Sequence, residues 1–180
     1  MNIMNETLKS PFFKYCLDPF GTGLFRQQKD PVPCSCCGRT TQLVYDGPFY
    51  TQIRDVRLCP ECVHSGAAAA KFEGMFADWG QDGEACAPEA KDELAHKTPS
   101  PTTWQDFFWP VHCGDFCAFV AYVGYEELVA MGLAESAEPI DPLPDGLTLR
   151  DLQNGPGASP QGYLFRCLGC GKNLVLCDFG

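Results

Sequence analysis

Cys34-Ser35-Cys36-Cys37-Gly38 and Cys59-Pro60-Glu61-Cys62 are the two stretches that decide the fold of this chain. Each contains a C-x-x-C pair, and 21 residues separate the two pairs. Two such pairs about twenty residues apart are typical of a four-thiolate zinc site, in which each pair supplies two corners of a tetrahedron. We predict a first zinc site at Cys34, Cys37, Cys59 and Cys62, with Cys36 as an alternative to Cys34 because it adjoins a ligand.

The residues around these pairs predict a local fold. Residues 43–45 and 49–51 are apolar and flank the turn-forming trio Asp46-Gly47-Pro48, so we expect a hairpin there. Pro60 suits the first turn of a helix, and good helix formers continue to Met75. A knuckle, a hairpin and a helix in this order predict a treble-clef-like module.

A second set of cysteines lies further along the chain. Cys167 and Cys170 stand between two apolar runs, which predicts a zinc-ribbon-like hairpin with a knuckle at its tip. Cys113 and Cys117 would share one face if that stretch is helical. We therefore predict a second zinc ion (Zn2+) at Cys113, Cys117, Cys167 and Cys170. His112 could replace either Cys113 or Cys117, and a buried cluster of thiols without metal is the alternative.

The chain is expected to form one α+β body. Residues 1–11 are polar and read as a flexible N-terminus, followed by a single body over residues 12–180. Within it, residues 12–77 form the first zinc module, residues 101–180 form the second, and residues 78–100 are an acidic connector. Further expected elements are helices at 88–96, from Thr103 through Phe108 and at 125–131, a buried strand or helix at 116–123, and loops at 135–146 and 154–162.

The charge of the chain is strongly negative. Thirteen Lys and Arg residues stand against 23 Asp and Glu residues, which gives a net charge of −10 and argues against nucleic acid as a default partner. The acids are concentrated in residues 78–93 and 126–151. They form either a solvated surface that keeps the protein soluble or, in the functional interpretation, a surface complementary to a basic protein. The oligomeric state is left open.

Catalytic motifs are missing from the sequence. A zinc ion held by four thiolates has no open coordination position and is a poor Lewis acid. The chain has no H-E-x-x-H, G-x-S-x-G or Walker A motif and no zinc-deaminase signature. We expect a non-enzymatic protein that acts by binding another protein. The alternatives are a zinc-dependent hydrolase that uses the His112/Cys113 region and a nucleic-acid-binding zinc ribbon.

Motifs spread from residue 12 to 179 carry a family resemblance. They are Phe12-Phe13-Lys14-Tyr15, the two C-x-x-C pairs, Tyr45-x-Gly-Pro-Phe-Tyr50, Lys71-Phe72, Trp104-Gln105, Trp109-x-x-His112-Cys113, Tyr122-Val-Gly124 and Tyr163-Leu-Phe-x-Cys167-Leu-x-Cys170-Gly171-Lys172. In these the chain resembles the bacterial CbrC family, which is named for tolerance of a nuclease colicin. The resemblance implies a cytoplasmic, immunity-like protein, and together with the charge it suggests a basic toxin or stress factor as partner.

Two further features agree with a cytoplasmic location. The N-terminus lacks the basic and apolar regions of a secretory signal. The longest apolar run, residues 116–123, is too short to span a bilayer.

Overall fold

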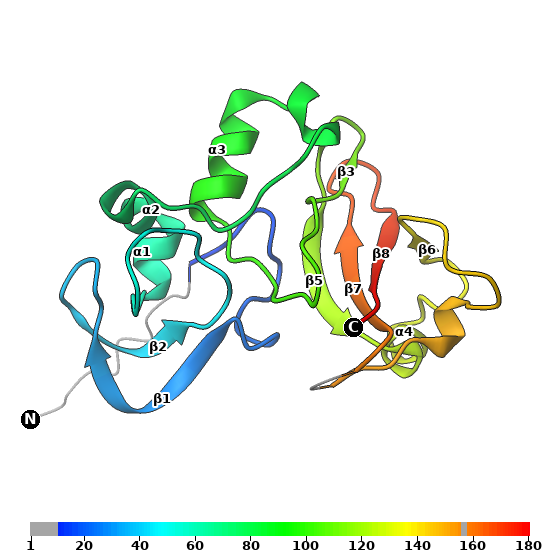
Figure 1. The fold of residues 1–180 in the computed structure, drawn as a ribbon, viewed down its shortest axis with the longest axis horizontal. Coiled ribbons are helices and arrows are strands. Elements are labelled where there is room, and N and C mark those ends of the chain that lie inside the picture. The colour runs from blue at the N-terminus through cyan, green and yellow to red at the C-terminus, as the bar shows by residue number, and fades with distance from the viewer. Residues whose placement is uncertain (1–10, 156–157) are drawn as a thin grey trace, which may run out of the picture.

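The computed structural model describes residues 11–155 and 158–180, so the predicted flexible N-terminus lies outside the described residues except for Pro11. The class is mixed α+β, as predicted. Figure 1 shows β1, β2 and the first three helices on one side of the molecule, and β5, β7, β8, β6 and α4 on the other. The elements are β1 (Phe25–Pro33), β2 (Thr40–Tyr45), α1 (Pro60–His64), α2 (Ala67–Phe72), η1 (Asp82–Ala85), α3 (Pro88–Lys97), β3 (Val111–His112), β4 (Asp115–Phe116), β5 (Ala118–Val123), α4 (Tyr125–Ala130), β6 (Glu138–Pro139), η2 (Leu149–Asp151), β7 (Gln161–Arg166) and β8 (Asn173–Asp178).

The first hairpin pairs β1 with β2, and the turn between them carries the first C-x-x-C pair. The prediction that residues 43–45 pair with residues 49–51 is wrong. Tyr45 pairs with Phe25 instead, and their rings lie 5.6 Å apart. Aromatic packing across the β1–β2 pair favours this partner.

The helix after the second C-x-x-C pair is divided in two. α1 begins at Pro60 as predicted, but it ends at His64 because Gly66 takes a left-handed φ of 74°, which interrupts the helix. α2 follows and stops before Met75, which bridges Tyr50 instead. α3 confirms the helix predicted over residues 88–96.

The C-terminal half is built on a four-stranded sheet in the order β5-β7-β8-β6. The apolar run at 116–123 contributes β4 and β5, so it is extended rather than helical. β7 and β8 form the predicted hairpin, with the Cys167–Cys170 knuckle at its tip. α4 confirms the helix predicted over residues 125–131, and it ends before Gly132, whose φ is 71°.

The helix predicted from Thr103 through Phe108 does not form. Residues 103–108 are irregular. The backbone N–H groups of Trp104 and Gln105 donate to the Asp178 carboxylate, at 2.6 and 3.4 Å. This long-range partner replaces the local cap expected at Thr103, and Pro110 lies too close for a second helical turn to follow.

One cluster of buried side chains extends through both halves of the molecule. It joins Phe13 and Phe76 to Trp109, Phe119 and Phe165. A smaller cluster underlies α4. Among the described residues, no helix combines the length and the apolar character that crossing a bilayer requires.

Tyr45 ties the first hairpin to the segment that follows α3. Its hydroxyl accepts a hydrogen bond from the Ser100 N–H at 3.0 Å and donates to the Pro48 carbonyl at 3.0 Å. We expect Tyr45→Phe to lower the free energy of unfolding by about 1–3 kcal/mol, because the buried Ser100 N–H loses its partner. Urea denaturation measures this loss. Tyr50→Phe, at an exposed side chain, is the control, and an equal loss in both variants would contradict the assignment.

Candidate metal centres

The first candidate centre brings together all four cysteines of the two N-terminal C-x-x-C pairs. The Sγ atoms of Cys34, Cys37, Cys59 and Cys62 lie within 4.8 Å of one another. The first pair comes from the β1–β2 turn and the second from the start of α1, two elements that lie side by side (Figure 1). Cys36 is half-buried and lies outside this group, so the structure places Cys34 rather than Cys36 with the other thiols.

Backbone hydrogen bonds close the turn that carries Cys34 and Cys37. Gly38, with φ of 74°, donates its N–H to the Cys34 carbonyl at 2.8 Å, and the Cys34 N–H donates to the Arg39 carbonyl at 2.9 Å. Lys71 of α2 donates from Nζ to the carbonyls of Ser35 and Cys36, at 2.9 and 2.7 Å. The turn is therefore fixed from inside and from the neighbouring helix.

The four thiols of the first centre need a compensating positive charge when they are ionised. Cys34, Cys59 and Cys62 are buried, and burial raises the pKa of both Cys59 and Cys62. The exposed Cys37 differs, because its hydrogen bond with Arg39 lowers the pKa of its thiol to about 6. Several buried thiolates so close together are costly without a compensating charge, and a zinc ion supplies that charge.

The second candidate centre contains His112, Cys113, Cys167 and Cys170. His112 Nδ1 lies 3.2 Å from Cys113 Sγ and 3.4 Å from Cys170 Sγ. The first two residues come from the β3–β4 hairpin, and the other two come from the tip of the β7–β8 hairpin. Three sulfurs and one imidazole nitrogen are a donor set that zinc accepts.

Cys117, a ligand in the sequence prediction, lies outside this group, and His112 stands in its place. The prediction assumed a helix, whereas residues 111–116 form a hairpin in which His112 pairs with Asp115. Cys117 follows that hairpin and is 0% exposed. Its carbonyl accepts a hydrogen bond from Trp109 Nε1 at 2.7 Å, which holds this residue in the core.

The second knuckle repeats the hydrogen bonds of the first. Gly171, with φ of 77°, donates to the Cys167 carbonyl at 2.9 Å, and the Cys167 N–H donates to the Lys172 carbonyl at 2.8 Å. Although burial acts to raise it, the backbone N–H of Cys170 and the His112 side chain lower the pKa of Cys167 to about 6. The same short sequence pattern, C-x-x-C-G followed by a basic residue, thus builds both knuckles.

Five cysteines lie outside the two groups: Cys16, Cys36, Cys86, Cys117 and, on β8, Cys177. All twelve cysteines lie within the described residues and none forms a disulfide. Burial raises the pKa of Cys177 to about 11, so this thiol is protonated at neutral pH.

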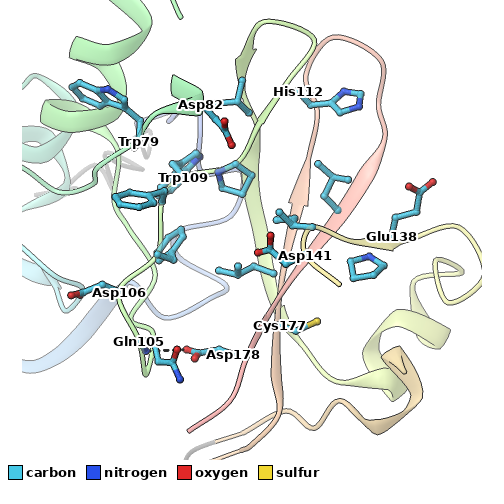
Figure 2. Close-up of a pocket in the computed structure, with 18 of the residues that line it drawn as sticks. Trp79, Asp82, Gln105, Asp106, Trp109, His112, Glu138, Asp141, Cys177 and Asp178 are labelled. Carbon is cyan, nitrogen blue, oxygen red and sulfur yellow. Dashed lines mark hydrogen bonds between the residues drawn. The ribbon is translucent and has the colours of Figure 1, made fainter. Parts of the chain in front are cut away.

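A cleft of about 860 Å³ opens beside the second centre, with His112 in its wall. Figure 2 shows Trp79, Asp82 and Trp109 on one side of it and Glu138 on the other. We call it the acidic cleft, because its lining includes the carboxylates of Asp82, Asp106, Glu138, Asp141 and Asp178. Sequence reasoning identified the acidic segments but missed Asp106 and Asp178, which stand outside both of them.

Comparison with known proteins finds the chain similar to one family. A family described as "Uncharacterised protein family (UPF0167)" matches residues 10–179. A UPF0167 protein of Pseudomonas aeruginosa is 33% identical over 182 residues, covering 98% of this chain and 99% of the relative. UPF0167 proteins of Mycobacterium bovis and Mycobacterium tuberculosis are each 34% identical over 184 residues, covering 95% of this chain and 94% of each relative.

These matches correct the predicted resemblance to the CbrC family. Both the family match and the relatives carry the UPF0167 designation, and none points to CbrC. The expectation of colicin tolerance rested on that resemblance alone, so it is no longer supported. No solved structure matches the chain.

Proposed function

Because the chain belongs to the UPF0167 family, whose description names no activity, we infer its function from its own residues and propose a zinc-stabilised, non-enzymatic protein that binds a basic protein partner. The observation that carries this proposal is the acidic cleft beside a candidate metal centre with four protein donors. We further propose a reducing, cytoplasmic setting, which agrees with twelve cysteines free of disulfides.

Closed coordination supports a structural role for the metal. Each candidate centre offers four protein donor atoms, which fill a tetrahedral zinc ion and leave no position for water or substrate. The first centre has its knuckle in the turn of the β1–β2 hairpin and its second pair of cysteines at the start of α1, so the knuckle and the helix, but not the hairpin predicted between them, support a treble-clef-like module. The β7–β8 hairpin fits a zinc ribbon. In this proposal the two ions hold four chain segments in place, and the acidic cleft beside the second centre is free to bind a partner.

The position of the acids supports a basic partner. Asp82 comes from the acidic segment 78–93, whereas Glu138 and Asp141 come from the segment 126–151, and all three line one cleft. Lys172 is the only lysine or arginine in the described lining, and it is paired with Glu138 at 2.7 Å. Charge of one sign in a concave surface steers an oppositely charged partner toward it.

We expect this partner to be captured in a salt-dependent manner. The tagged protein should retain basic proteins from a bacterial lysate at low salt and release them at about 0.5 M salt, where the Debye length falls below about 5 Å. Mass spectrometry would identify the captured proteins. Neutralising four acids of residues 135–145, of which Glu138 and Asp141 line the cleft, should reduce capture; that variant carries Glu135→Gln, Glu138→Gln, Asp141→Asn and Asp145→Asn.

The control for this experiment changes the net charge equally on the other half of the molecule. It carries Asp30→Asn, Asp55→Asn, Glu61→Gln and Glu73→Gln, all at exposed positions. Equal capture by the two variants and the parent protein would contradict the electrostatic part of the proposal.

One observation favours a second candidate function, a zinc-dependent hydrolase. His112 belongs to the second centre and also lines the acidic cleft, so a metal ion there would border a space large enough for a substrate. The four protein donors argue against it, since a hydrolytic zinc ion keeps one position for water. Hydrolysis of a generic ester or phosphoester by the zinc-loaded protein, lost in a His112→Ala variant, would favour this alternative.

A further inference from the structure

We propose that the acidic cleft binds an arginine side chain, presented by an extended basic segment of the partner. This inference rests on the proposed function and names the chemistry of its binding site. One side of the cleft comes from the irregular segment 105–110, and the other comes from β8 and the residues that follow β6 (Figure 2). An extended chain fits such an open groove better than a compact ligand does.

Three carboxylates in the cleft are available to a cation. Asp82, Asp106 and Asp141 are exposed, and none of them takes part in an ion pair within residues 11–155 and 158–180. The acids of α3 differ, because Asp92 is paired with Lys97 at 2.6 Å. The cleft therefore carries negative charge that the described part of the chain leaves uncompensated.

A buried carboxylate at the floor of the cleft points to a hydrogen-bond donor in the ligand. Asp178 is 6% exposed, and its Oδ2 accepts hydrogen bonds from the Trp104 N–H at 2.6 Å and from the Tyr163 hydroxyl at 3.3 Å. Its Oδ1 receives no hydrogen bond from the described residues, yet it is not fully shielded from solvent. This oxygen can therefore accept a further hydrogen bond, and a ligand N–H reaching through the cleft would supply a charge-assisted one.

Aromatic rings in the lining favour arginine over lysine. Phe108 is 67% exposed, and it is held at this place because its ring lies against Gly80, where a Cβ would come within 2.6 Å of it. Trp79 already has Lys91 Nζ at 5.6 Å from its ring centroid, so a cation is accommodated at this wall. A guanidinium can stack on a ring and bind a carboxylate with two parallel hydrogen bonds, whereas an ammonium can do neither so well.

Titration calorimetry at low salt with the full-length, zinc-loaded protein tests the proposal. The probes are hexa-arginine and hexa-lysine peptides. We expect hexa-arginine to bind several-fold more tightly than hexa-lysine, and the double variant Asp106→Asn/Asp141→Asn to weaken hexa-arginine binding by about tenfold. Phe108→Ala should reduce the preference for arginine, since it removes the exposed ring and leaves every charge in place.

The control is the double variant Asp30→Asn/Asp55→Asn, which has the same net charge and leaves the cleft intact. We expect it to bind hexa-arginine within twofold of the parent protein. Equal weakening in the two double variants, or equal affinity for the two peptides in the parent protein, would overturn the proposal. If lysate capture is salt-dependent while the cleft variants bind normally, this inference fails and the proposed function stands; if hexa-arginine binds in the cleft but no basic protein is captured, the proposed function fails.

Discussion

Replacing Cys59 with serine is expected to remove one zinc ion per chain and to abolish the cooperative thermal transition of the protein. Structural zinc contributes about 10–16 kcal/mol in small modules, whereas whole domains are stable by about 5–15 kcal/mol. Cys59 lies at the start of α1 and is buried, so its loss leaves three thiols and no closed site. Elemental analysis measures the metal, and differential scanning calorimetry measures the transition.

Cys36→Ser is the matched control for this prediction. Cys36 lies within the same turn but outside the group of four, so we expect the variant to keep both zinc ions and a melting temperature close to that of the parent protein. Loss of zinc from Cys36→Ser, or a full complement of zinc in Cys59→Ser with an unchanged transition, would contradict the assignment of ligands.

Replacing His112 with alanine is expected to remove the second zinc ion while the first stays bound. His112 Nδ1 lies 3.2 and 3.4 Å from two of the three sulfurs in the second group, so the change deletes one of four donors. Cys117→Ala should keep both ions, because Cys117 is outside the group. Zinc stoichiometry after gel filtration distinguishes the two variants.

A conservative variant separates ligand loss from unfolding. His112→Cys supplies a fourth sulfur at the same position, and we expect it to restore at least part of the zinc lost in His112→Ala. The opposite pattern, with zinc lost in Cys117→Ala and kept in His112→Ala, would contradict the placement of His112 at the second centre.

Local features of the fold could be predicted from the sequence. The two knuckles follow from a five-residue pattern, because the glycine after each C-x-x-C pair takes a left-handed φ and closes the turn by itself. The start of α1 at Pro60 and the length of α3 follow from similarly local preferences. These elements can be predicted from neighbouring residues alone, because their conformation does not depend on partners distant in the sequence.

Features that depend on distant partners could not be predicted in the same way. β2 pairs with β1 rather than with the nearer residues 49–51, because Phe25 provides an aromatic partner for Tyr45. The segment from Thr103 is held by Asp178, a residue more than seventy positions away. The cysteine spacing also favoured Cys117 as a ligand. The β3–β4 hairpin that brings His112 to the second group could not be predicted from that spacing.

The acidic cleft also depends on residues that are distant from one another in the sequence. Two acidic segments were visible in the sequence, but only the folded chain places Asp82 of η1 and Asp141, which follows β6, in the lining of one cleft. Asp178 was invisible as a candidate, since a single acid near the C-terminus carries no pattern. Its burial and its place in the lining of the cleft emerge only in three dimensions.

Zinc K-edge X-ray absorption of the purified full-length protein, combined with its zinc content, tests most directly whether two closed metal centres hold this fold. We expect two zinc ions per chain and a first shell of seven sulfurs and one nitrogen shared between them, with Zn–S distances of about 2.3 Å. Less than one zinc ion per chain after expression in zinc-containing medium, or a shell dominated by oxygen, would contradict this account.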